Sequence, residues 1–119
     1  MDWDLGGGTM TLITYQTGDA SMYLSSGGGV IGGGQHENVN KASKEFVSMS
    51  QSYLENSLKT DTTTLPDKEC FKFYFLTNKG KFVAQESIDN IENRTSKWLE
   101  LFESANSVIT ELRLITQNK

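Results

Sequence analysis

The chain has 119 residues, of which 22% are charged and 36% hydrophobic, a composition typical of one folded domain. Its formal net charge of −4 argues against a nucleic acid or an anionic membrane as partner, because contact with phosphates needs a basic surface. The single cysteine, Cys70, excludes an internal disulfide, and one histidine with one cysteine offers no cluster of metal ligands. We therefore expect a single domain over residues 1–119 with neither metal nor cofactor.

The first residues of the chain and its apolar segments indicate the cellular compartment of the protein. Residues 1–4 lack the basic and apolar regions of a signal peptide. No apolar segment approaches the roughly 20 residues that a membrane span requires. The sequence therefore predicts a cytoplasmic protein that makes no contact with a membrane.

An antiparallel hairpin is predicted near the start of the chain. Thr9–Tyr15 and Ala20–Leu24 both alternate apolar with polar side chains, as strands with one buried face do. Between them Gln16–Asp19 forms a turn, in which Gly18 is able to take a positive φ. Val30-Ile31 is either a short third strand or an apolar peg that pins the following loop to the core.

The apolar period then changes to that of a helix, with Asn38 as its predicted N-cap. The apolar stripe of this helix consists of Val39, Ala42, Phe46, Val47, Met49, Tyr53, Leu54 and Leu58. Residues Thr60–Thr64, followed by Pro66-Asp67, end the helix and form a linker.

The second half of the chain predicts another hairpin and a long helix. Cys70–Thr77 alternates with three phenylalanines on one side, and a turn at Asn78–Gly80 leads into a strand over Phe82–Gln85. Ser87 caps a helix over Ile88–Thr116, which would be about 42 Å long. Because that length exceeds the width of a domain of this size, its last turns are expected to project, bend or pack on a second copy.

The order of elements is β-β-(β)-α-β-β-α, which predicts the α+β class. We expect an antiparallel sheet of four to five strands with two helices, the C-terminal one long. The three phenylalanines and Trp98 are expected in the core.

The most informative stretch runs from Ser25 to His36 and holds six of the 11 glycines. Glycine costs conformational entropy wherever it is ordered, so this density needs a reason. Either a ligand or partner approaches the backbone closely, or the chain needs dihedrals and packing that other residues do not allow. The candidate binding residues are Ser25, Ser26, Gly27, Gly28, Gly29, Gly32, Gly33, Gly34, Gln35 and His36.

The residues of this stretch suggest three kinds of chemistry. Gly27-x-Gly29-x-x-Gly32 matches the dinucleotide-binding pattern, but that pattern needs a parallel β-α-β unit, whereas hairpins flank it here. Glycine amides that lead into a helix N-terminus could instead bind a phosphate or carboxylate. A hydrolase with Ser25 or Ser26 as nucleophile and His36 as base is a third interpretation, although no nucleophile-elbow motif is present.

The stretch Ser21–His36 resembles a motif of small uncharacterised bacterial proteins, (S)LY-S-GGG-(V/I)IGGG-H, which precedes a helix, an aromatic strand and a C-terminal helix. This resemblance implies a bacterial cytoplasmic protein and carries no activity with it. The order of elements is also similar to profilin-like and roadblock-type domains, which act as dimeric scaffolds or as regulators of small GTPases. Those domains usually begin with a helix, which this sequence lacks.

The function expected first is a non-catalytic protein-interaction or regulatory module, immunity- or scaffold-like. An acidic protein of this kind would bind a basic protein partner by charge complementarity, with the glycine-rich segment or the long helix at the contact. The long helix could also mediate a homodimer. The alternatives are a domain that binds a small anion through Gly27–Gly34 and, last, the serine hydrolase.

Overall fold

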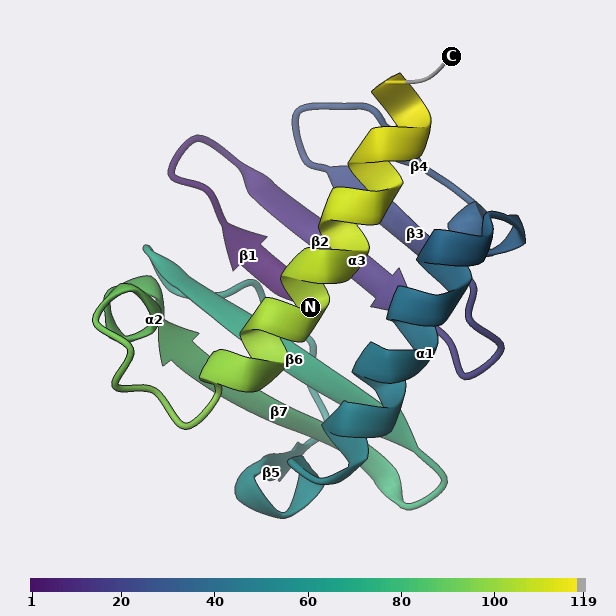
Figure 1. The fold of residues 1–119 in the computed structure, drawn as a ribbon. Helices are drawn as coiled ribbons and strands as arrows, with labels where there is room; N and C mark the ends of the chain where they lie inside the picture. The colour runs from purple at the N-terminus through teal and green to yellow at the C-terminus, as the bar shows by residue number, and fades with distance from the viewer. Residues whose placement is uncertain (118–119) are drawn as a thin grey trace.

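The computed structural model describes residues 1–117, which form one seven-stranded antiparallel sheet and three α-helices (Figure 1). This arrangement confirms the α+β class and the antiparallel sheet, but the expected four to five strands and two helices are too few. The elements in chain order are β1 (Asp2–Asp4), β2 (Thr9–Thr14), β3 (Ala20–Leu24), β4 (Gly29–Val30), the 3₁₀ turn η1 (Gly33–Gln35), α1 (Glu37–Gln51), the 3₁₀ turn η2 (Leu54–Asn56), β5 (Leu58–Thr60), β6 (Cys70–Thr77), β7 (Gly80–Ser87), α2 (Ile88–Glu92) and α3 (Leu99–Gln117).

The sheet has the strand order β4-β3-β2-β1-β6-β7-β5, so both predicted hairpins lie in one layer. Strand β1, which the sequence analysis missed, joins them. Trp3 of β1 pairs with Met10 of β2 on one side and with Phe71 of β6 on the other. The outer strands β4 and β5 are only two and three residues long, which keeps the exposed edges of the sheet short.

Helices α1 and α3 both lie across the same face of the sheet, the near face in Figure 1. The core fills the space between these two layers, and it includes the three phenylalanines of β6 and Trp98, as predicted. The buried apolar side chains are Met10, Leu12, Ala20, Met22, Val39, Phe46, Phe71, Phe73, Phe75, Trp98, Leu101, Phe102, Ala105, Val108, Ile109 and Leu112.

The first helix differs from its prediction at both ends. It begins at Glu37 with His36 at the N-cap position, so Asn38 lies inside the helix and does not cap it. The helix ends at Gln51, where the Ser50 and Ser52 hydroxyls donate to carbonyls three residues back and so compete with the helical pattern. Leu58 then falls in β5, paired with β7, and not on the helical stripe.

The predicted long C-terminal helix is broken into α2 and α3. Ser87 caps α2 as expected, since its Oγ accepts a hydrogen bond from the amide of Asp89 at 3.1 Å. Arg94 then takes a φ of 59°, which a continuous helix does not allow, and the helix resumes only at Leu99. The 19 residues of α3 span about 28 Å. That length fits within the 38 × 33 × 28 Å molecule, so helix length no longer argues for a projecting end.

The break between α2 and α3 is organised by Glu86 at the end of β7. Its Oε1 accepts hydrogen bonds from the Ser87 amide and from Asn90 Nδ2, both at 2.8 Å. Its Oε2 accepts one from Ser96 Oγ at 2.7 Å, and Ser96 Oγ in turn accepts the Trp98 amide at 3.0 Å. One carboxylate therefore fixes the chain that enters α3.

This network sets an expected pH dependence of stability. Burial raises the pKa of Glu86, but hydrogen bonds from Ser96, Asn90 and Ser87 outweigh burial and, with Lys97, leave the pKa below its ordinary value. A carboxyl of lowered pKa stabilises the fold fully above its unfolded pKa, and this contribution is lost as the pH falls through the folded pKa. We expect Glu86→Gln to lower the free energy of unfolding by about 2 kcal/mol at pH 7 and by clearly less at pH 3. Urea denaturation at both pH values measures this, and an equal loss at both would contradict it.

The face of the sheet opposite the helices is partly covered by a strap, residues 61–69, which runs from β5 across β7 and β6. Tyr74 Oη donates to the Thr64 carbonyl at 2.6 Å, and Gln85 Nε2 donates to Asp67 Oδ2 at 2.9 Å. Both Tyr74 and Gln85 belong to the face opposite the phenylalanines, because side chains alternate along a strand. The segment predicted as a linker thus lies on the sheet over β6 and β7, whereas Ile13, Tyr15 and Tyr23 on the same face are exposed.

Candidate functional site

The glycine-rich segment does not form one continuous site, because its two halves lie at opposite ends of β3. Ser25–Gly28 form the turn between β3 and β4. Gly32–His36 lie at the other end of β3, where the amide of Gly34 donates to Asp19. Five residues of strand span about 16 Å. The ten predicted site residues therefore belong to two separate places.

In the turn between β3 and β4 several backbone groups and the Ser25 hydroxyl form hydrogen bonds within the chain. The Gly27 amide donates to the Leu24 carbonyl at 3.0 Å, and the Leu24 amide donates to the Gly28 carbonyl at 3.1 Å. Gly27 and Gly28 have φ values of 108° and 85°, which side-chain-bearing residues rarely adopt. Ser25 Oγ accepts the Thr9 amide at 2.8 Å and so ties the turn to the start of β2. Backbone geometry and pairing account for this half of the segment.

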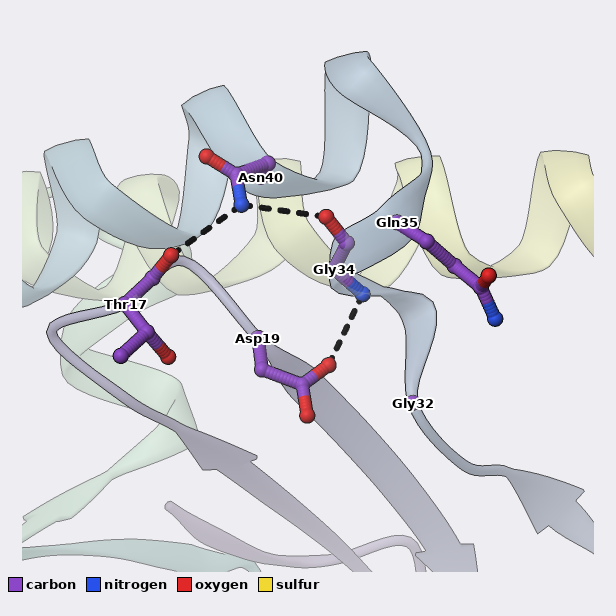
Figure 2. Close-up of a pocket in the computed structure, with 6 residues that line it drawn as sticks. All are labelled: Thr17, Asp19, Gly32, Gly34, Gln35 and Asn40. Carbon is purple, nitrogen blue, oxygen red and sulfur yellow. Dashed lines mark hydrogen bonds between the residues drawn. The ribbon is translucent and has the colours of Figure 1, made fainter.

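The other half is held by three residues that we call the Asp19 clamp: Asp19, Gly34 and Asn40 (Figure 2). Asp19 Oδ1 accepts the Gly34 amide at 2.9 Å, while Asn40 Nδ2 donates to the carbonyls of Gly34 at 3.0 Å and Thr17 at 3.1 Å. Buried Ser43 adds a bond from its Oγ to the Asp19 carbonyl at 3.1 Å. The clamp thus binds the β2–β3 turn, the glycine-rich segment and α1 to one another.

Two further glycines lie where the backbone passes close to other atoms. A Cβ on Gly29 would overlap the carbonyl oxygen of Met22 in the neighbouring strand. A Cβ on Gly33 would overlap a methyl group of Leu112 in α3 and lie 3.2 Å from Val39 Cγ1. These positions exclude larger residues for reasons of packing, without any ligand.

The depression beside the clamp has a volume of about 370 Å³ and is shallow. Its lining residues are Thr17, Asp19, Gly32, Gly34, Gln35 and Asn40. The amides of Gly32 and Gly34 already donate to Ser21 Oγ at 3.3 Å and to Asp19 Oδ1. The Asp19 carboxylate therefore occupies the position in which an external anion would bind, and its charge repels such an anion. Anion binding would require Asp19 to move away.

The residues of the hydrolase interpretation lie far apart. His36 is exposed at the first turn of α1, and its side chain makes no cap hydrogen bond. Ser26 is exposed in the turn at the opposite end of β3. Gln35 is exposed as well, and Figure 2 shows its side chain pointing away from Asn40 and Asp19. The geometry brings no serine of this segment to His36.

The dinucleotide pattern also lacks its structural context. The strand before it, β3, runs antiparallel to both of its neighbours, β2 and β4. A Rossmann phosphate site needs a parallel crossover at this point. Within residues 1–117, no three side chains of His, Cys, Asp or Glu gather so that they could hold a metal ion.

The clamp residues Asp19 and Asn40 were not singled out from the sequence, and neither was Ser43. Ser43 lies four residues after Val39 and three before Phe46, so helical periodicity places it on the buried stripe of α1. A polar residue on such a stripe needs a hydrogen-bond partner, which was the available signal. Asp19 gave a weaker signal of a structural role, since it ends the turn before β3.

Comparison of the chain with protein-family models, with curated proteins and with solved structures finds no match. In the part of the chain that the structure describes, no helix has both the length and the apolar character to cross a membrane. The resemblance to small bacterial proteins and to profilin-like and roadblock-type domains therefore stays a prediction.

Proposed function

We propose that this protein is a non-catalytic interaction module that binds a protein partner through the β2–β3 face. This face consists of Thr11, Ile13, Tyr15 and Tyr23, on the side of the sheet opposite α1 and α3. The observation that carries the proposal is the exposure of its large side chains, which is 36% for Ile13, 51% for Tyr15 and 40% for Tyr23.

The register of the strands places these side chains next to one another. Tyr23 pairs directly with Thr11, and Ile13 pairs with Ser21 on the same face. Ile13 and Tyr23 are therefore diagonal neighbours, about 7–8 Å apart and within reach of one another. Exposed aromatic and aliphatic side chains on adjacent strands form the kind of surface that a protein partner desolvates on binding.

We assign the contact to this face because the amides of Gly27, Gly32 and Gly34 in the glycine-rich segment already donate hydrogen bonds within the protein. The Asp19 clamp fixes the turn that joins β2 to β3, so it supports the face from one end. The separation of Ser26 from His36 supports a function without catalysis. The net charge of −4 favours a basic partner, because long-range attraction raises the rate of encounter.

The test is affinity capture from the native cell with the double variant Ile13→Thr/Tyr23→Thr. Threonine suits a strand, so the fold is expected to persist while the apolar contact is lost. We expect this variant to capture at least about tenfold less of the partner than the unchanged protein does. The reason is that interface anchors each contribute more than about 1 kcal/mol.

A matched control lies on the same face of the sheet beyond the strap. Leu58 and Leu76 are 74% and 78% exposed, so the variant Leu58→Thr/Leu76→Thr also removes two exposed apolar side chains from this face. Capture should be unchanged with the control. Equal capture by both double variants, or loss with the control alone, would refute the assignment of the contact to the β2–β3 face.

A further inference from the structure

A second surface, separate from the β2–β3 face, lies at one end of the central strands, where β1 ends and α2 begins. Figure 1 shows α2 on the left, on the same side of the molecule as the end of β1 and the start of β6. Here a groove of about 390 Å³ opens over the side chains of Trp3 and Ile88. Both side chains are half-buried and pack against the core, and the Trp3 ring meets Phe102 edge-on with centroids 5.0 Å apart. The groove therefore has an apolar floor supported by α3.

The walls of this groove carry charge of one sign. Asp4 and Glu69 line one side, and Asp89 and Glu92 line the other, while no lysine or arginine lines it within residues 1–117. The Glu69 amide donates to Asp4 Oδ2 at 2.7 Å, which fixes the first wall by joining β1 to the start of β6.

None of these four carboxylates is neutralised by the described part of the chain. Within residues 1–117 the single ion pair joins Arg94 to Glu103 at 3.9 Å, and neither residue lines the groove. Four carboxylates without an ion-pair partner in residues 1–117 lie around an apolar floor and repel one another, so a cation placed between them is favourable. The carboxylates do not converge as a group that could hold a metal ion, so an extended organic cation fits the groove better.

We propose that this groove binds an arginine-containing segment of a protein partner. The aliphatic stem of an arginine would lie on Ile88, and its guanidinium would stack on the indole of Trp3. An indole attracts a cation more strongly than the rings of tyrosine or phenylalanine do. The planar guanidinium would then donate to carboxylates on both walls, which a compact ammonium does less well. This inference does not depend on the β2–β3 face, because no residue is shared between the two surfaces.

The experiment is a titration of the ¹⁵N-labelled protein with the peptide Arg-Leu-Arg-Leu-Arg-Leu, followed by NMR. We expect the Trp3 indole resonance and the Asp89 and Glu92 amides to shift, while the indole of buried Trp98 stays in place. Raising the salt concentration should weaken the binding, because the attraction is between exposed charges.

The variant Asp89→Asn/Glu92→Gln removes two wall charges whose side chains have no hydrogen bond assigned in residues 1–117. It should weaken peptide binding about fivefold, since two exposed charge contacts are lost. The matched control Glu45→Gln/Asp61→Asn changes two exposed residues outside the groove and alters the net charge equally. It should bind the peptide as the unchanged protein does.

Several results would overturn the proposal. Absence of any shift at Trp3 would do so, and so would an equal loss of affinity with the control variant. Equal binding of Glu-Leu-Glu-Leu-Glu-Leu would show that charge does not select the ligand. Equal binding of spermidine would show that a small free polyamine, and not a protein segment, is what the groove takes.

Discussion

Replacing Gly34 with alanine should lower the free energy of unfolding by about 3 kcal/mol. A Cβ at this position would lie 2.5 Å from the Cα and 3.0 Å from the amide nitrogen of Asp19, so backbone would have to move. That movement would also break the hydrogen bond from the Gly34 amide to the Asp19 carboxylate. Urea denaturation followed by circular dichroism measures the change.

Gly7→Ala is the matched control for this experiment. Gly7 has no atom within 4 Å of an added Cβ and no positive φ, so the substitution should change the stability by less than about 0.5 kcal/mol. If Gly34→Ala proved as neutral as Gly7→Ala, the close contact between the glycine-rich segment and Asp19 would be wrong. The segment would then be free to serve a ligand.

Phe71→Ala should have the largest effect of any single substitution considered, a loss of about 4 kcal/mol. Phe71 is fully buried, and its ring lies against Phe73 and Phe102 with centroids 5.2 and 4.8 Å away. It also pairs with Trp3, so it supports the strand that joins the two hairpins. A loss of this size approaches the whole stability of many domains of this length.

Leu76 lies on the same strand as Phe71 but is 78% exposed, so Leu76→Ala should be nearly neutral. Denaturation midpoints of the two variants give the comparison directly. Similar losses for both would mean that the two faces of β6 are not buried as differently as described.

A strand was predicted where apolar and polar side chains alternate regularly, and it was missed where they do not. β6 was predicted with its observed bounds because three phenylalanines recur at every second position. β1 was missed, since its three residues are one tryptophan between two aspartates and show no period. The aspartates lie on the face without helices, where Asp2 Oδ1 accepts a hydrogen bond from Thr11 Oγ1 at 2.7 Å. Only the neighbouring strands reveal this.

The predicted helices were too long because apolar spacing alone does not show where a helix ends. Leu58 fits the helical spacing of the apolar residues of α1, yet it lies in β5 and pairs with Val83 of β7. In the same way the apolar seam continues across the break between α2 and α3. The break depends on the hydrogen bond between Ser96 and Glu86, which lies before α2, and apolar periodicity does not reveal a contact between polar side chains.

The candidate site was predictable in part. The glycine density correctly marked a segment in which close packing and positive φ are required, at Gly29 and Gly33 for packing and at Gly27 for φ. The segment alone did not reveal its partners Asp19 and Asn40, because they come from the preceding turn and the following helix. The β2–β3 face was equally hidden, since its exposure depends on where the strap crosses the sheet.

The most direct test of the account maps the binding site on the ¹⁵N-labelled protein with the partner obtained by affinity capture. We expect the largest amide shifts at Ile13, Tyr15 and Tyr23, with Gly32–His36 little changed because the Asp19 clamp keeps that segment in place. Largest shifts at Gly32–His36, with the β2–β3 face unchanged, would contradict the account.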